Sequence, residues 1–200
     1  MIADQAWVLK PHGPVRAAVV YVHGWGDTSP AHHAWFDHLR ARGVAVVFPR
    51  YQVDTSDPAP GTIGHLRNGL RHAFADPALR GKPVVAVGYS WGAKLVFDYG
   101  VNAKRWGVPA PRAIESIFPP SRTYGGPPHG RLPPAVRVLL FAGELDNVPD
   151  ARAFWRWLRN VPQKTFRVIA NATHDWGGRE DAVGRRLFWA PLDGLVARYT

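Results

Sequence analysis

Six short apolar runs recur along the chain, and we predict that each of them forms a β-strand. The runs are rich in β-branched residues, which favour extended backbone. Several of them place apolar side chains at consecutive positions, as strands do in a sheet that is buried on both faces. The predicted strands are Ala17–Val22, Val44–Pro49, Pro83–Tyr89, Arg112–Phe118, Arg137–Ala142 and Thr165–Ala170.

Amphipathic segments alternate with these runs, and their apolar residues recur with the period of a helix. Ser29 can cap a first helix that Gly43 ends, and Thr62 can cap a second one. Two further helices are expected over Ala151–Arg159 and Pro191–Arg198. Strands that alternate with helices are typical of an α/β protein, with a mostly parallel central sheet and helices on both of its faces.

The segment Pro119–Pro134 breaks this alternation, because prolines and glycines are concentrated in it. Proline lacks the backbone N–H that a helix interior requires, and its ring clashes with the preceding turn. We therefore expect an irregular surface loop at the edge of the sheet. No segment of the chain suggests a large cap domain or a lid.

Length and composition fit one globular domain over residues 1–200. Hydrophobic residues make up 46% of the chain and charged residues 20%, which is ordinary for a globular protein. The N-terminal segment lacks the basic and apolar regions of a signal peptide. The apolar runs are also too short to span a bilayer. These features predict a cytoplasmic protein without a membrane partner.

The absence of cysteine and the net charge limit the kinds of site and partner that the protein can have. The chain has no cysteine, which excludes disulfides, thiolate metal sites and a cysteine nucleophile. The formal net charge is +10, and a basic balance can indicate an anionic partner. The arginines are scattered along the chain rather than gathered in blocks with aromatic residues, so a solvated basic surface is favoured and no nucleic-acid partner is expected.

The strongest chemical signal is the segment Gly88-Tyr89-Ser90-Trp91-Gly92. An apolar run precedes it and a helical pattern follows it, so Ser90 is expected on a sharp turn between a strand and a helix. Such a turn exposes the serine hydroxyl, and the flanking glycines let the backbone pass close to its neighbours. The N-terminus of the following helix favours negative charge that develops nearby. Ser90 is therefore the predicted nucleophile.

A second signal, His23-Gly24-Trp25-Gly26, directly follows the first predicted strand. A tight turn here can aim a backbone N–H at the carbonyl oxygen of a substrate on Ser90. We predict an oxyanion hole formed by the N–H groups of Trp25 and Trp91. His23 itself is expected to be a buried, hydrogen-bonded residue that shapes the loop.

A serine nucleophile needs a base, and the base needs a carboxylate that orients it. Asp146 comes just after the predicted strand Arg137–Ala142, and it is the preferred acid. Asp150 competes with it but is more simply a helix-capping carboxylate. Glu144 also competes, and it is closer to the strand and could support the site indirectly.

The predicted base is His174, in the segment that follows the last predicted strand. Its position decides this choice, because the chain has nine histidines. Six of the others are expected at a helix start, on an outer helix face or in loops rich in proline and glycine: His32, His33, His65, His72, His12 and His129. No pair of histidines has the context of a metal site, so we expect neither a metal nor another cofactor.

Four segments together resemble the α/β-hydrolase superfamily: HGWG, GYSWG, GELDNVP and THDWGG. They occur in the superfamily's order, and the resemblance extends from Val19 to Gly178. It implies a triad of Ser90, Asp146 and His174. The short chain is similar to small, lidless members, in outline to the dienelactone hydrolase-like group, whose typical cysteine nucleophile is replaced here by serine. The dehalogenase and epoxide hydrolase branches place an aspartate at that position and do not fit.

These features predict a serine hydrolase that cleaves the carboxylic ester or thioester bond of a small molecule. Aromatic residues near the motifs suggest an apolar substrate pocket, and the candidates are Tyr89, Phe118, Tyr124 and Trp176. An acyltransferase, a lactonase or an amidase could use the same triad, because the pocket chooses the acyl acceptor. A non-catalytic binding protein with a hydrolase fold is the remaining alternative.

Overall fold

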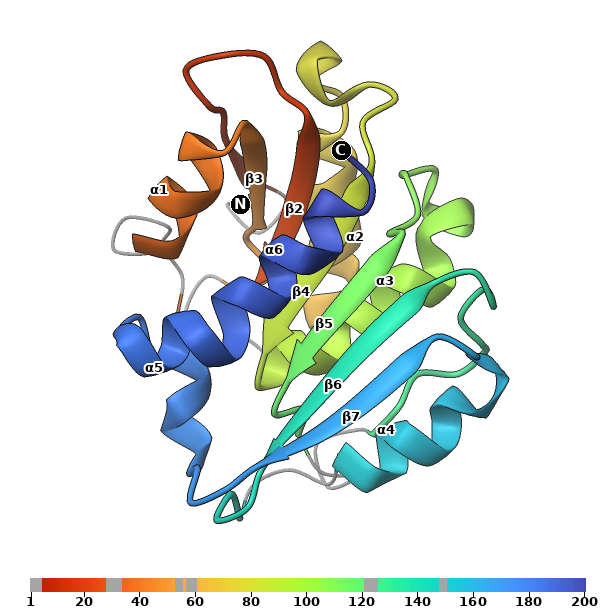
Figure 1. Ribbon diagram of the computed structural model, residues 1–200. Helices are drawn as coiled ribbons and strands as arrows, with labels where there is room; N and C mark the ends of the chain where they lie inside the picture. The colour runs from red at the N-terminus through yellow and green to blue at the C-terminus, as the bar shows by residue number, and fades with distance from the viewer. Residues whose placement is uncertain (1–4, 28–33, 53–55, 57–60, 121–125, 148–150) are drawn as a thin grey trace.

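One seven-stranded sheet runs through the protein (Figure 1). The structure is a computed structural model that describes residues 5–27, 34–52, 56, 61–120, 126–147 and 151–200. The strand order is β1-β3-β2-β4-β5-β6-β7. All neighbouring strands are parallel except β1, which pairs antiparallel with β3. The strands are β1 Ala6–Leu9, β2 Ala17–Val22, β3 Val44–Pro49, β4 Val84–Tyr89, β5 Ala113–Ile117, β6 Arg137–Gly143 and β7 Lys164–Ile169.

The six predicted strands are confirmed, with ends that differ by at most one residue. The sequence did not reveal β1, whose four residues are all only partly buried. It is held at the edge of the sheet by its ladder with β3 and by the backbone bond from Arg50 N–H to the carbonyl of Gln5 (2.8 Å). A strand this short has no periodicity to detect.

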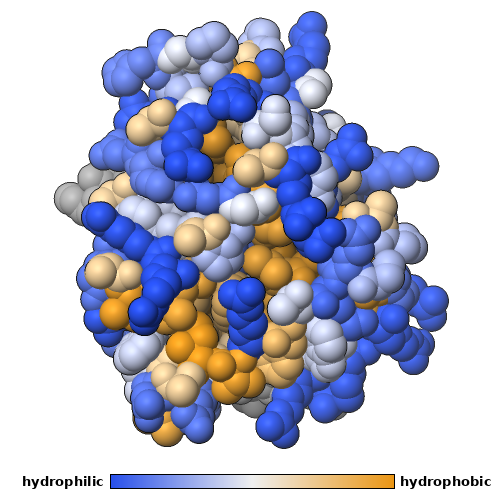
Figure 2. All heavy atoms as spheres, in the orientation of Figure 1, coloured by the Kyte–Doolittle hydropathy of each residue, from blue (hydrophilic) through white to orange (hydrophobic). Residues whose placement is uncertain are grey.

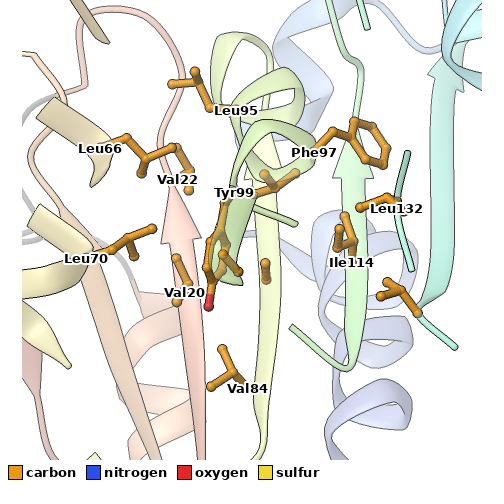
Figure 3. Packing of buried hydrophobic residues seen from close by; sticks show 14 of the residues in the cluster. Val20, Val22, Leu66, Leu70, Val84, Leu95, Phe97, Tyr99, Ile114 and Leu132 are labelled. Carbon is orange, nitrogen blue, oxygen red and sulfur yellow. The ribbon is translucent and has the colours of Figure 1, made fainter. Parts of the chain in front are cut away.

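Helices cover both faces of the sheet, as the alternation of elements predicted. The cluster on one face joins residues of α2, α3 and α4, and the cluster on the other joins residues of α1 and α6. Figure 3 shows Leu66 and Leu70 of α2 beside Val20 and Val22 of β2, with Tyr99 of α3 next to them. The helices are α1 Ala34–Ala41, α2 Thr62–Ala73, α3 Trp91–Trp106, α4 Ala151–Trp157, α5 Ala182–Gly184 and α6 Ala190–Ala197.

Two helix ends differ from the prediction. Thr62 does not cap α2: the N-cap is Gly61, which makes no side-chain capping bond, and Thr62 is buried inside the first turn. The predicted helix Pro191–Arg198 corresponds to α6, Ala190–Ala197, but helical backbone already begins at Ala182, where Asp181 caps α5 by accepting bonds from the N–H groups of Val183 and Gly184. A π-helical turn over Arg185–Trp189 then joins α5 to α6.

The proline-rich connection between β5 and β6 contains no helix among its described residues, as predicted. We predicted that this connection lies at the surface of the protein and at the edge of the sheet, and part of that prediction was wrong. It joins two inner strands, and Leu132 is buried against α3, where its side chain approaches Gly100. In the described part of the chain, no helix is both long and apolar enough to cross a membrane. One domain over residues 1–200 stays a prediction.

The face that carries α6 holds a buried acid. Figure 1 shows α6 in front of β2 and β4, with no helix in front of β6 and β7, and Figure 2 shows apolar residues reaching the surface of this face. Glu115 of β5 is 0% exposed on this side of the sheet. Among the described residues, neither of its carboxylate oxygens has a hydrogen-bond partner. Burial raises the pKa of Glu115 well above its usual range, against a smaller lowering by Arg167.

Glu115 should make the folded state less stable as the pH rises. Its pKa is raised on folding, so the folded protein binds one proton more than the unfolded chain between the unfolded and the folded pKa values. Within that window the free energy of unfolding falls by about 1.4 kcal/mol per pH unit. Glu115→Gln is neutral at every pH and should lack this slope.

Urea unfolding of both proteins from pH 4 to pH 8 measures the effect. The variant should gain stability relative to the parent protein as the pH rises. Parallel stability curves for the two proteins would show that Glu115 is ionised in the folded state.

Candidate active site

Ser90 lies at the junction of β4 and α3, on a backbone turn that few residues adopt. Its φ is +55° and its ψ is −119°, outside the regions that L-residues ordinarily occupy. The turn is fixed by a bond from Ser90 N–H to the carbonyl of Ile117 on β5 (2.9 Å). Gly92 permits the turn, because a Cβ there would lie 1.9 Å from the carbonyl oxygen of Val22. The hydroxyl therefore stands at the carboxyl end of the sheet.

The structure brings together the three residues that the sequence predicted as a triad. His174 lies in a 3-10 turn over His174–Gly178, after β7. Its Nε2 is 2.8 Å from Ser90 Oγ, and its Nδ1 is 2.9 Å from Asp146 Oδ2. The Asp146 side chain is fully buried, while 24% of the His174 side chain is exposed. One hydrogen-bonded chain thus runs from a buried carboxylate to a reachable hydroxyl.

Backbone contacts hold the Asp146 loop against the His174 loop. Leu145 N–H donates to the carbonyl of Ala172 (3.0 Å), and the Glu144 carboxylate accepts a bond from Asn171 N–H (2.9 Å). Glu144 therefore supports the loops and is not in the hydrogen-bonded chain. The other competitor for the acid, Asp150, lies outside the described residues.

The turn after β2 lies directly beside Ser90. A Cβ on Gly24 would lie 3.5 Å from Ser90 Cβ, and a Cβ on Gly92 would lie 2.4 Å from the carbonyl oxygen of His23. The Trp25 and Trp91 rings meet edge to face at 5.5 Å. The two backbone segments that carry the predicted oxyanion donors, Trp25 and Trp91, therefore flank the nucleophile.

Two residues that hold this turn were not found from the sequence. Tyr51 donates its hydroxyl to the carbonyl of His23 (2.9 Å), and Gln52 accepts a bond from Gly26 N–H (3.1 Å). His23 is 0% exposed, and its ring stacks between Tyr51 and Phe48. A polar residue just after a strand, as Gln52 is after β3, is the signal that could have indicated this role.

The predicted pocket residues occupy different surroundings. Phe118 is fully buried and packs edge to face with Phe188, so its ring belongs to the core. Trp176 is partly buried, with the Arg179 guanidinium 4.9 Å from the centre of its ring. Tyr124 lies outside the described residues. Trp25 is 40% exposed and is the most open of the aromatic residues around Ser90 that the structure describes.

Tyr89, the fourth predicted pocket residue, contacts the loops around it. Its hydroxyl donates to the backbone carbonyl of His174 (2.9 Å), and the two rings are 5.3 Å apart. Burial raises the pKa of Tyr89 to about 12, with smaller contributions from the charges of Asp146 and Asp175. The phenol therefore stays protonated and remains a donor across the physiological range.

The described residues contain no group of three or more histidine and acidic side chains that could hold a metal ion. The arrangement around Ser90 consists of one hydroxyl, one imidazole, one carboxylate and two nearby backbone segments. Such a set can activate a serine oxygen for attack on an acyl carbon and can stabilise the resulting oxyanion.

Comparisons with known proteins give no match by sequence, either to a family model or to a curated protein. The fold is similar to that of several solved structures. Esterase 2 of Thermogutta terrifontis, in a form phosphoramylated by tabun, aligns with a TM-score of 0.76 at 19% identity, over 96% of this chain and 88% of that one. Est1E from Butyrivibrio proteoclasticus aligns with a TM-score of 0.67 at 12% identity, over 97% of this chain and 93% of that one.

A soluble variant of monoglyceride lipase from Saccharomyces cerevisiae, in complex with a substrate analog, aligns with a TM-score of 0.72 at 14% identity, over 98% of this chain and 91% of that one. Identities this low concern the fold rather than the activity. The parallel sheet, the antiparallel strand at its edge and the similarity to these structures all indicate the same fold. The chain has the α/β-hydrolase fold.

Proposed function

We propose that this protein is a serine hydrolase that cleaves the carboxylic ester or thioester bond of a small molecule. In this proposal Ser90 is the nucleophile, His174 the general base and acid, and Asp146 the carboxylate that orients His174. The N–H groups of Trp25 and Trp91 form the oxyanion hole. The cytoplasmic location remains a prediction.

The unbroken contact from Asp146 through His174 to Ser90 supports this function most strongly. Both distances, 2.9 Å and 2.8 Å, are those of hydrogen bonds. When His174 Nδ1–H donates a hydrogen bond to Asp146 Oδ2, the Nε2 lone pair faces the Ser90 hydroxyl. The turn that carries Ser90 also has the strained backbone of a nucleophile elbow.

The first half of the reaction forms an acyl-enzyme. Ser90 Oγ attacks the carbonyl carbon while its proton moves to His174 Nε2, and the carbonyl π electrons move onto oxygen. The backbone donors stabilise that negative charge. As the tetrahedral intermediate collapses, the bond to the leaving group breaks, and His174 passes its proton to the departing alcohol or thiol. Asp146 stabilises the charged imidazole throughout.

The second half repeats these steps with water. His174 removes a proton from a water molecule, whose oxygen attacks the acyl carbon. The bond to Ser90 Oγ breaks when the second tetrahedral intermediate collapses, and the proton returns to Ser90. The products are a carboxylic acid and the free enzyme, and these residues complete the cycle without drawing on another reactive group.

Ser90→Ala should abolish ester hydrolysis without unfolding the protein. The variant lacks the attacking oxygen, and kcat/KM for p-nitrophenyl butyrate should fall by roughly 10⁴-fold or more. The assay is p-nitrophenolate release, with circular dichroism to compare the folds. Equal turnover by both proteins would place the nucleophile elsewhere, and a parent protein that is folded but inactive toward esters and thioesters would contradict the proposed reaction.

Asp146→Asn should lower kcat by about 10⁴-fold, because an amide no longer holds His174 in the tautomer that accepts a proton from Ser90. Asp175→Asn is the matched control. Asp175 also adjoins His174, but it is exposed and bonds to Thr173 Oγ1 (2.5 Å). The control should change kcat by less than about threefold. Similar losses in the two variants would show that general electrostatics, rather than the Asp146 bond, supports the base.

A further inference from the structure

The ring of Tyr89 lies where three separate segments of the chain meet. Tyr89 ends β4, directly before Ser90. A Cβ on Gly24 would lie 3.0 Å from Tyr89 Cδ1, and a Cβ on Gly177 would lie 2.4 Å from Tyr89 Cδ2 and Cε2. One side of the Tyr89 ring therefore contacts the turn after β2, and the other side contacts the turn that begins at His174.

The ring of Tyr89 fits between these two turns because Gly24 and Gly177 carry no side chain. At Gly177 any side chain would overlap the ring, since real Cβ atoms do not approach within 3.0 Å of such atoms. At Gly24 a Cβ would already be at the limit of contact. Gly24 of the HGWG segment and Gly177 of the THDWGG segment therefore both leave space for the ring of the residue that precedes the nucleophile.

The hydroxyl adds a specific bond to this packing. Tyr89 Oη donates to the carbonyl oxygen of His174 itself (2.9 Å), rather than to a neighbouring residue. This bond fixes the backbone from which the imidazole extends to Ser90. Rates of acyl transfer depend steeply on the placement of the base, so a small shift of this backbone lowers the rate without changing the pocket.

On the basis of the serine hydrolase activity proposed above, we propose that Tyr89 is a positioning residue for His174. It holds the base and the turn that carries Trp25 in register with Ser90, and it does not line the substrate pocket. This replaces the pocket role that the sequence suggested for it.

The two roles predict different kinetics. A positioning residue acts on every substrate alike, so its loss lowers kcat by one factor for all acyl chains and leaves KM unchanged. A pocket residue contacts the acyl chain, so its loss changes KM by an amount that depends on chain length. A residue that merely supports the fold changes the melting temperature and neither kinetic constant.

Tyr89→Phe is the primary variant, with Tyr99→Phe as its matched control. Tyr99 also donates its hydroxyl to a backbone carbonyl, that of Pro109, on a different loop from those that carry His174 and Trp25. Both variants and the parent protein are assayed with p-nitrophenyl acetate, butyrate and octanoate. The rate of labelling by a fluorophosphonate is measured alongside, and melting temperatures are recorded for all three proteins.

Tyr89→Phe should lower kcat roughly tenfold for all three esters, with KM within about twofold of the parent value. Labelling should slow by the same factor. Tyr99→Phe should keep the parent kcat, KM and labelling rate even where its melting temperature falls. A loss that varies with acyl length, or kinetics equal to those of Tyr99→Phe, would overturn the positioning role.

A second measurement tests the packing of the ring without relying on the hydroxyl. Gly177→Ala forces the ring of Tyr89 to move and should lower kcat at least tenfold. In a Tyr89→Ala background the same substitution should have much less effect, because the ring it displaces is absent. Additive losses would show that Gly177 and Tyr89 act separately and would contradict the inference.

The same experiments distinguish a failure of the positioning role from a failure of the proposed function. If the parent protein neither labels nor turns over any ester, the serine hydrolase proposal fails, and the positioning role fails with it. If the parent protein is active and Tyr89→Phe behaves like Tyr99→Phe, the hydrolase stands and only the positioning role is wrong.

Discussion

The close approach of α3 to the end of β2 is the constraint on which the site depends. Gly92 passes so near Val22 that any side chain there would meet the carbonyl oxygen at 1.9 Å. Ser90 turns between these two segments with a positive φ, a backbone conformation that is unfavourable by roughly 1–3 kcal/mol. Burial of most of α3 against the sheet offsets that strain. The same approach sets the turn after β2 beside the serine.

The parallel sheet then supplies the other parts of the site. The carboxyl ends of parallel strands share one edge, so residues that follow β4, β6 and β7 meet there although the sequence separates them. The acid and base loops are joined to each other by backbone bonds, and Tyr89 joins the base loop to the strand that carries Ser90. The buried Asp146 and the partly exposed His174 thereby occupy fixed positions.

Where local patterns carry the information, the sequence predicted the fold and the three residues that the structure places in one hydrogen-bonded chain. Ser90, Asp146 and His174 each follow a strand that the sequence predicted. The parallel arrangement of these strands then brings the three residues to the same edge of the sheet. Features that depend on contacts between residues far apart in the sequence could not be predicted from local patterns. β1 is too short to show a period, and nothing local reveals that Thr62 binds the indole of Trp91 instead of capping its helix. The direction of the Tyr89 ring depends on a glycine far along the chain.

Peptide mapping of the protein after reaction with a fluorophosphonate tests the central claim most directly, because it identifies the nucleophilic atom instead of a loss of rate. The hydrogen-bonded chain that ends at Ser90 predicts one covalent adduct, on the peptide that contains Ser90, and no adduct when His174 is replaced by alanine. An adduct on any other residue, or none on well-folded protein, would contradict a catalytic role for this site.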